Sequence, residues 1–284
     1  MLRTVTLRYA GALAVPLLCL GCENAPPIQP TPIPTSISAR SFSLGGFVGD
    51  TAGRDLAGAR VEVVDDRGAA TVTTTDGHGH FSLPGPFTGT VRVTASHDGH
   101  LSQTKTYALP DQARTGAQGR VTFGLEAPGS SAQIVGNFTV TLTADASCTG
   151  LPDEGRARGY STTITGDVRN GFAGRLSGAR FFPWTSNCPG PDECLLDRFW
   201  LGTAGDYVGG YMSIIEQLSD TSYLIADGRI SGSISSTGVT ASLDGYLDFC
   251  RSPPNQVDQG TWTCPPASGT FCHSANHRID LIRR

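Results

Sequence analysis

The sequence predicts an all-β protein, in which a seven-stranded β-sandwich is followed by a disulfide-bonded antiparallel barrel or sandwich of about eight strands. Three observations support this prediction. Gly is abundant at 36 residues and charged residues make up only 16% of the chain, a composition typical of short strands joined by tight turns. Short runs rich in Val and Thr alternate with clusters of turn residues. Six cysteines lie in the second half of the chain, where we expect the disulfides.

The N-terminus has the pattern of an export signal. A positively charged start is followed by the apolar residues 13–20, and Cys22 comes after a small residue. This pattern resembles the bacterial lipoprotein signal, which implies that residues 1–21 are removed and that Cys22 becomes the lipid-modified first residue. Cys19 departs from the family pattern, which prefers an aliphatic residue there, and an ordinary secretory signal is the alternative. We expect a lipid anchor that holds the protein on a membrane of the bacterial cell envelope, facing the periplasm or the exterior.

The composition of residues 22–40 predicts a Pro-rich linker. Pro recurs among Thr and Ser, and such a segment cannot bury a core and tends to extend. It is typical of a spacer between a membrane and a folded domain.

Residues 41–127 predict the first β-domain. Asp76 and the glycines at 77 and 79 form a tight corner, after which Phe81 and Leu83 alternate with a polar residue as a half-buried strand does. Seven short strands in such a length indicate a sandwich. The expected strands are 42–48, 59–64, 70–75, 80–83, 90–95, 103–108 and 120–125, with breaks at 50–53, 66–68, 84–89 and 97–99.

Several motifs in this domain together resemble the carboxypeptidase regulatory-like domain. They are GFVGD at 46–50, LAGARVEV at 56–63, TTTD at 73–76 with GHFSLPG at 79–85, GTVRV at 89–93 and GH at 99–100. The resemblance covers about residues 43–109 and implies a transthyretin-like sandwich. His78 and His100 depart from it, because the family usually has Asp or Asn and an aromatic residue at these loop positions.

The resemblance does not imply peptidase activity. The regulatory-like module carries no catalytic residues, and a zinc carboxypeptidase needs a His-x-x-Glu pair with a distant His. None of the six histidines has Glu three positions later.

Residues 132–284 predict a Cys-rich antiparallel β-domain, after a boundary at 127–131. About eight strands with hairpin-length connections indicate an up-and-down meander, either a small closed barrel or a sandwich, and we prefer the barrel. The pattern is similar in general appearance to lipocalins but has no lipocalin signature, so no function follows from it. A short helix is expected within 151–157. The expected strands are 138–143, 160–167, 172–176, 198–201, 210–218, 223–232, 238–247 and 278–282.

The cysteines of this domain predict three disulfides, because an exported chain meets an oxidising compartment. Irregular spacings make a zinc site a poor alternative. Among the fifteen possible pairings of six cysteines, our first choice joins local pairs around Pro-rich loops. The expected pairs are Cys188 with Cys194, Cys250 with Cys264, and Cys148 with Cys272.

Three groups of side chains are candidates for chemistry. Aromatic residues could line a ligand site, although core packing explains them equally well: Trp184, Trp200, Tyr207, Tyr211 and Trp262. Carboxylates could pair for glycoside hydrolysis, although they also form turns: Asp192, Glu193, Asp197, Asp206, Asp227 and Asp244. Histidines could bind a metal, although we favour solvated turn residues and structural roles and expect no metal: His78, His80, His97, His100, His273 and His277.

No motif identifies a catalytic residue or a cofactor, and a net charge of -4 without a basic cluster argues against nucleic acid. We expect a non-catalytic envelope lipoprotein whose β-modules bind carbohydrate or a surface protein. A hydrolase with its site in the second domain, and a purely structural envelope protein, are the alternatives.

Overall fold

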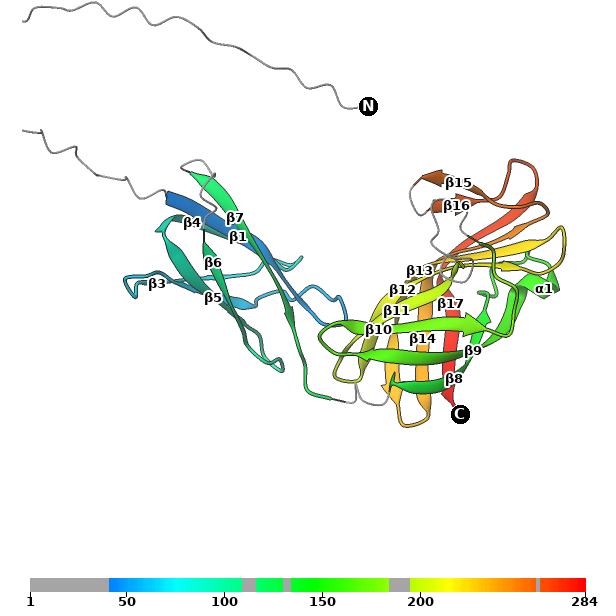
Figure 1. The fold of residues 1–284 in the computed structure, drawn as a ribbon, viewed down its shortest axis with the longest axis horizontal. Coiled ribbons are helices and arrows are strands. Elements are labelled where there is room, and N and C mark those ends of the chain that lie inside the picture. Colours follow the sequence, from blue (N-terminus) through cyan, green and yellow to red (C-terminus); the bar gives the residue numbers. More distant parts are fainter. Residues whose placement is uncertain (1–40, 109–115, 130–133, 184–194, 259–260) are drawn as a thin grey trace, which may run out of the picture. The chain divides into compact units, whose positions relative to one another are not determined.

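The computed structural model describes residues 41–108, 116–129, 134–183, 195–258 and 261–284 (Figure 1). The predicted signal, Cys22, the linker, Trp184, Cys188 and Cys194 lie outside these residues. The described chain is built almost wholly of strands, which confirms the all-β class. Within the described residues, no helix is long and apolar enough to cross a membrane.

Seven strands of the first domain form two sheets, as the sequence predicted. The first sheet has the order β4-β1-β7 and the second β3-β2-β5-β6. Strand β1 pairs antiparallel with β4 and parallel with β7. The strands are β1 (Ser41–Asp50), β2 (Arg60–Val64), β3 (Ala70–Thr74), β4 (His80–Thr88), β5 (Thr90–Ser96), β6 (Gln103–Ala108) and β7 (Ala117–Leu125).

The core of this domain comes from the alternation of each strand. Val61 and Val63 of β2 and Phe123 of β7 are almost completely buried, and the residues between them point outward. The two inner faces together form one apolar cluster.

The corner before β4 forms as predicted, whereas the break expected at 84–89 is wrong. The Asp76 carboxylate accepts hydrogen bonds from the backbone N–H groups of His78 and His80, each at 2.9 Å. Strand β4 continues to Thr88, with a register shift against β1. It is an edge strand, so its prolines do not remove hydrogen bonds from the interior of a sheet.

The second domain is a closed barrel of eight strands, with the order β10-β11-β12-β13-β14-β17-β8-β9. All eight expected strands are present, most of them longer than predicted, and the short helix α1 (Asp153–Arg156) lies where it was expected. The barrel strands are β8 (Gly136–Thr143), β9 (Ala157–Asp167), β10 (Gly171–Ser177), β11 (Asp197–Ala204), β12 (Tyr207–Gln217), β13 (Tyr223–Ser235), β14 (Gly238–Cys250) and β17 (Gly269–Arg283).

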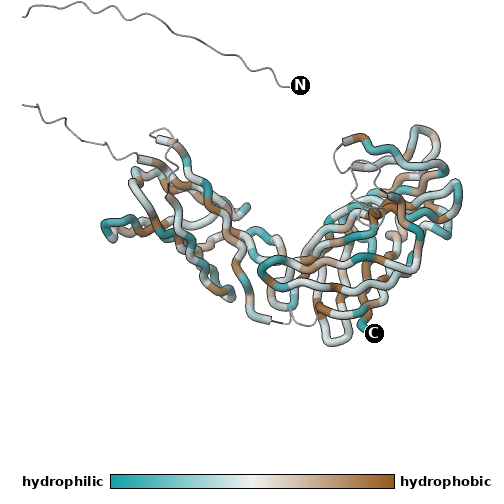
Figure 2. Tube along the Cα trace, viewed as in Figure 1, coloured by the Kyte–Doolittle hydropathy of each residue, from teal (hydrophilic) through white to brown (hydrophobic). Residues whose placement is uncertain are grey.

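Apolar side chains from the barrel strands form its core. Phe138, Phe199 and Met212, from three different strands, are each at most 1% exposed. Hydrophobic and hydrophilic positions alternate along these strands (Figure 2). The polar positions therefore lie on the outer wall of the barrel.

A second apolar cluster lies outside the barrel core. It joins Ile215 and Tyr223 of the wall to Trp262 of a small hairpin, β15 (Asn255–Asp258) and β16 (Thr261–Thr263), which the sequence did not predict. The Trp262 side chain is buried because the hairpin packs on the wall.

Two of the three predicted disulfides are confirmed. Cys148 pairs with Cys272, and Cys250 pairs with Cys264. The last strand begins at Gly269 and not near residue 278, so Cys272 lies within β17 and not before it.

Candidate functional site

Polar side chains form a transverse row on the outer wall of the barrel. Asn137 of β8 lies opposite Thr163 of β9, Thr163 lies opposite Arg175 of β10, and Arg175 lies opposite Arg198 of β11. Directly opposed residues of neighbouring strands point to the same face of a sheet. This register places two amide or hydroxyl groups and two guanidinium groups side by side.

An aromatic pair lies in the adjacent row. Trp200 of β11 lies opposite Tyr211 of β12, and their side chains are 51% and 40% exposed. Trp200 alternates with the buried Phe199 and Leu201, so the strand directs the indole to solvent. These two rings give the polar wall an exposed apolar surface.

Tyr211 is held in place by a hydrogen bond. Its hydroxyl donates to Oδ1 of Asp227 on β13 at 2.5 Å. Desolvation and the neighbouring Asp227 carboxylate raise the pKa of Tyr211 above its ordinary value. The ring therefore stays neutral and oriented while one face is accessible.

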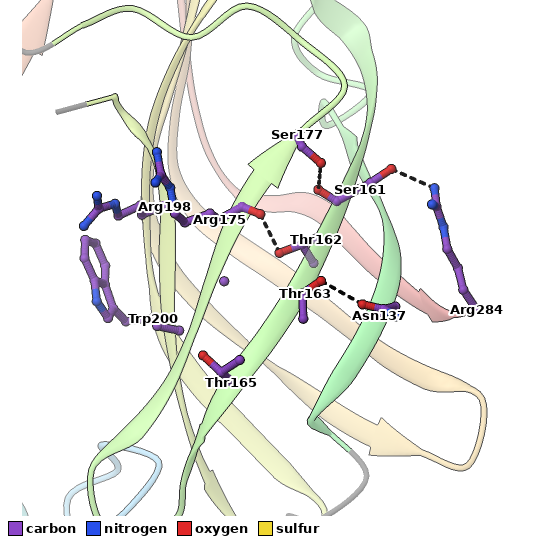
Figure 3. Close-up of a pocket in the computed structure, with 12 residues that line it drawn as sticks. Asn137, Ser161, Thr162, Thr163, Thr165, Arg175, Ser177, Arg198, Trp200 and Arg284 are labelled. Atoms are coloured by element: carbon purple, nitrogen blue, oxygen red, sulfur yellow. Dashed lines mark hydrogen bonds between the residues drawn. The ribbon is translucent and has the colours of Figure 1, made fainter. Parts of the chain in front are cut away.

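A groove of about 730 Å³ lies along β8, β9, β10 and β11, with Trp200 at one side and Arg284 at the other (Figure 3). Hydrogen bonds order its wall: Thr163 Oγ1 donates to Asn137 Oδ1 at 2.7 Å, and Arg284 Nη2 donates to Ser161 Oγ at 2.8 Å. We call this surface the wall groove. It is lined by Asn137, Ser161, Thr162, Thr163, Thr165, Ala173, Gly174, Arg175, Ser177, Arg198, Trp200 and Arg284.

Arginines line part of the wall groove. Its described lining includes three arginines and no Asp or Glu. Asp197, which is only 3% exposed, forms ion pairs with Arg175 at 2.8 Å and with Arg198 at 3.5 Å. One buried carboxylate thus restrains two guanidinium groups.

The structure separates the predicted aromatic candidates. Trp200 lines the wall groove and Tyr211 extends its aromatic surface, whereas the half-buried Tyr207 at the start of β12 does not line it. Trp262 is 5% exposed and contacts Phe182 edge-on at 5.8 Å between ring centroids. It is therefore a core residue.

The structure accounts for several of the predicted carboxylates without catalysis. Asp197 pairs with two arginines, Asp227 accepts from Tyr211, and Asp244 lies exposed opposite Arg229. Asp192 and Glu193 lie outside the described residues.

Asp248 of β14 was not among the sequence candidates. Burial raises the pKa of its carboxyl to about 7. A lone Asp inside an apolar run was the only signal in the sequence, and it does not by itself indicate a site.

The histidines have different surroundings. His78 and His80 are exposed, and the His80 ring contacts Phe47 edge-on. His277 is completely buried, and its Nδ1 accepts a hydrogen bond from the Asp145 backbone N–H at 3.1 Å, while burial lowers its pKa. It lies close to Cys148 and Cys272, but those sulfur atoms are bonded to each other and not to a metal.

The comparisons with known proteins concern the first domain. Residues 43–126 match the family model of the carboxypeptidase regulatory-like domain, which confirms the resemblance seen in the sequence. The barrel and its wall groove lie outside the matched residues. No curated protein matches the chain.

Proposed function

We propose that the protein, whose residues 43–126 form a carboxypeptidase regulatory-like domain, is a non-catalytic cell-envelope lipoprotein that binds carbohydrate at the wall groove. The exposed pair of Trp200 and Tyr211 beside an ordered polar groove is the observation that carries this proposal. The matched family is a regulatory domain, which supports binding over hydrolysis. Asp197 forms an ion pair and Asp227 accepts a hydrogen bond from Tyr211, so both carboxylates have a structural role.

Carbohydrate fits the chemistry of the groove. The faces of sugar rings carry C–H groups that pack against aromatic rings, while their edges present hydroxyl groups that donate and accept hydrogen bonds. Trp200 supplies the aromatic face, and Asn137 and Thr163 supply amide and hydroxyl groups. Three arginines favour saccharides with carboxylate or sulfate groups, because guanidinium binds such anions through paired hydrogen bonds.

A surface protein is a poorer fit to this site. Stable protein interfaces have a buried apolar centre, whereas the described lining of the groove is mostly hydroxyl, amide and guanidinium groups. A protein partner is therefore an outcome of the test below and not part of the proposal.

The N-terminal sequence supports an envelope location. A lipid on Cys22 would hold the chain on a membrane, and the extended linker at 22–40 would let the folded part reach roughly 60 Å from it.

A glycan array with the purified protein tests the proposal. We expect binding to saccharides that carry acidic groups, weakened by added salt, and a several-fold loss in affinity for Trp200→Ala, since packing against an aromatic ring contributes on the order of 1 kcal/mol. Phe271→Ala is the matched control, because Phe271 is 59% exposed and does not line the groove. Unchanged binding by Trp200→Ala, or capture of a protein and no glycan, would refute the proposal.

A further inference from the structure

Two histidines are brought together by the turn between β5 and β6. The backbone N–H of His100 donates to the carbonyl oxygen of His97 at 3.1 Å, which closes a four-residue turn. Gly99 has φ of 74°, a conformation that favours Gly at the third position of such a turn. The first and fourth side chains of the turn lie next to each other, and the two imidazole rings meet at 73° with centroids 5.2 Å apart.

The ring nitrogens converge on one point. Nδ1 of His97 lies 3.3 Å from Nδ1 of His100, and each lies 3.0 Å from the carbonyl oxygen of Asp98. The three atoms form a nearly equilateral triangle of two nitrogen ligands and one oxygen ligand.

Something must lie between the two rings. The lone pairs of two neutral Nδ1 atoms repel each other at 3.3 Å, so either a hydrogen atom or a cation lies between the nitrogens. In the hydrogen-bonded form, both Nδ1–H groups donate to the Asp98 carbonyl oxygen, which has two lone pairs. Nε2 of His100 is buried without a hydrogen-bond partner among the described residues in either form, so it does not distinguish the two.

A metal ion just outside the plane of the three atoms accounts for the same separations. Two imidazole nitrogens bound at about 2.0 Å with a tetrahedral angle are about 3.3 Å apart, the separation observed here. We infer that His97 and His100 bind a transition-metal dication of the zinc class through Nδ1, with the Asp98 carbonyl oxygen as a third ligand and water completing the shell. Imidazole nitrogen suits Zn²⁺, Ni²⁺ and Cu²⁺, whereas Ca²⁺ and Mg²⁺ require oxygen ligands.

The surroundings allow a metal to enter. Both histidines are half-buried, and Asp98 and Gly99 between them are exposed. The site belongs to the first domain and shares no residue with the wall groove, so it is independent of the proposed carbohydrate function.

Titration of the purified protein with Zn²⁺ tests the inference. We expect one site by isothermal titration, a rise in melting temperature with Zn²⁺, and tighter binding of Cu²⁺ than of Zn²⁺. His97→Ala and His100→Ala should each weaken Zn²⁺ binding by roughly tenfold or more and abolish the rise, because each removes one of two nitrogen ligands. In the absence of metal, both variants should melt close to the wild-type temperature, since the turn is closed by backbone atoms.

His78→Ala is the control, because His78 is exposed in another glycine-containing turn of the same domain. It should leave Zn²⁺ binding unchanged. Absence of any Zn²⁺ binding, Zn²⁺ binding by the His97 and His100 variants that equals that of wild type, or a loss of binding in His78→Ala would overturn the inference. If His97→Ala does not fold, His97→Asn is judged by the same criteria.

Discussion

Arg158 of β9 and Glu216 of β12 form a two-point ion pair inside the barrel. Arg158 Nε donates to Glu216 Oε2 at 2.8 Å, its Nη2 group donates to Oε1, and the Tyr160 hydroxyl donates to Oε2 at 2.8 Å. Two strands, β10 and β11, separate β9 from β12 in the barrel order, so this contact crosses the barrel. Glu216 is 2% exposed, and its hydrogen bonds raise the pKa of Arg158.

Removal of either partner of this pair should destabilise the barrel strongly. We expect Glu216→Ala to lower the free energy of unfolding by roughly 1–3 kcal/mol, because it leaves the half-buried Arg158 guanidinium and the buried Tyr160 hydroxyl without their acceptor. Urea denaturation followed by tryptophan fluorescence measures the change. The exposed pair of Arg278 and Asp280 is the control, and Arg278→Ala should cost less than about 1 kcal/mol. Equal costs for the two variants would show that the pair has no cross-barrel role.

The two confirmed disulfides should differ in their contribution to stability. Cys148 and Cys272 are 124 positions apart, whereas Cys250 and Cys264 are 14 apart. Loop-closure entropy then favours the longer link by about 2 kcal/mol. We expect the double variant Cys148→Ser/Cys272→Ser to unfold at lower urea than Cys250→Ser/Cys264→Ser. The reverse order would mean that packing of the β15–β16 hairpin, and not chain entropy, dominates.

The sequence predicted the strands of the barrel but not the β15–β16 hairpin or the wall groove. Strands such as β8 show a clear alternation of apolar and polar residues, because one face meets the core and the other meets water. Trp200 was not predictable as an outward residue in this way, because it lies between the apolar residues Phe199 and Leu201. The hairpin that buries Trp262 was not predictable either, since it packs against wall residues that are distant in the sequence. The wall groove needs four strands in register, and the register is a property of the closed barrel and not of any one strand.

The turn histidines show the same limit. The sequence His97-Asp98-Gly99-His100 indicates a turn, and a turn alone favours solvated side chains. The sequence does not show how close the two Nδ1 atoms lie, because their separation depends on side-chain rotamers that the sequence does not specify.

Asp248 should make the protein less stable at alkaline pH. Burial raises the pKa of its carboxyl to about 7, from an ordinary value of 3.8, so the folded protein binds this proton more tightly than the unfolded chain does. The protonated Asp248 carboxyl therefore contributes its full stabilisation below the pKa of the unfolded chain. This stabilisation is lost as the pH rises through the pKa of the folded protein. We expect Asp248→Asn to be more stable than wild type at pH 8 by on the order of 1–2 kcal/mol, and similar to wild type near pH 4.

Unfolding by urea at several pH values measures the effect of Asp248. The buried His277 has a lowered pKa and acts in the opposite direction, so its effect is removed by taking the difference between wild type and variant at each pH. Asp244→Asn is the control, because Asp244 is exposed on the same strand. A difference between wild type and Asp248→Asn that does not change with pH would contradict the raised pKa.

Substitution of Cys22 should release the protein from the membrane. The predicted signal places Cys22 at the acylation position, and several acyl chains on one residue bury many methylene groups, each contributing about 0.8 kcal/mol. We expect Cys22→Ala to move from the membrane fraction to the soluble fraction and to lose incorporation of labelled fatty acid. Cys19→Leu is the matched control, because it removes the other cysteine of the signal and supplies the aliphatic residue that the pattern prefers there, so both measurements should stay unchanged. If Cys22→Ala stays with the membrane and keeps the label, the lipid anchor is wrong, whereas binding at the wall groove would be unaffected.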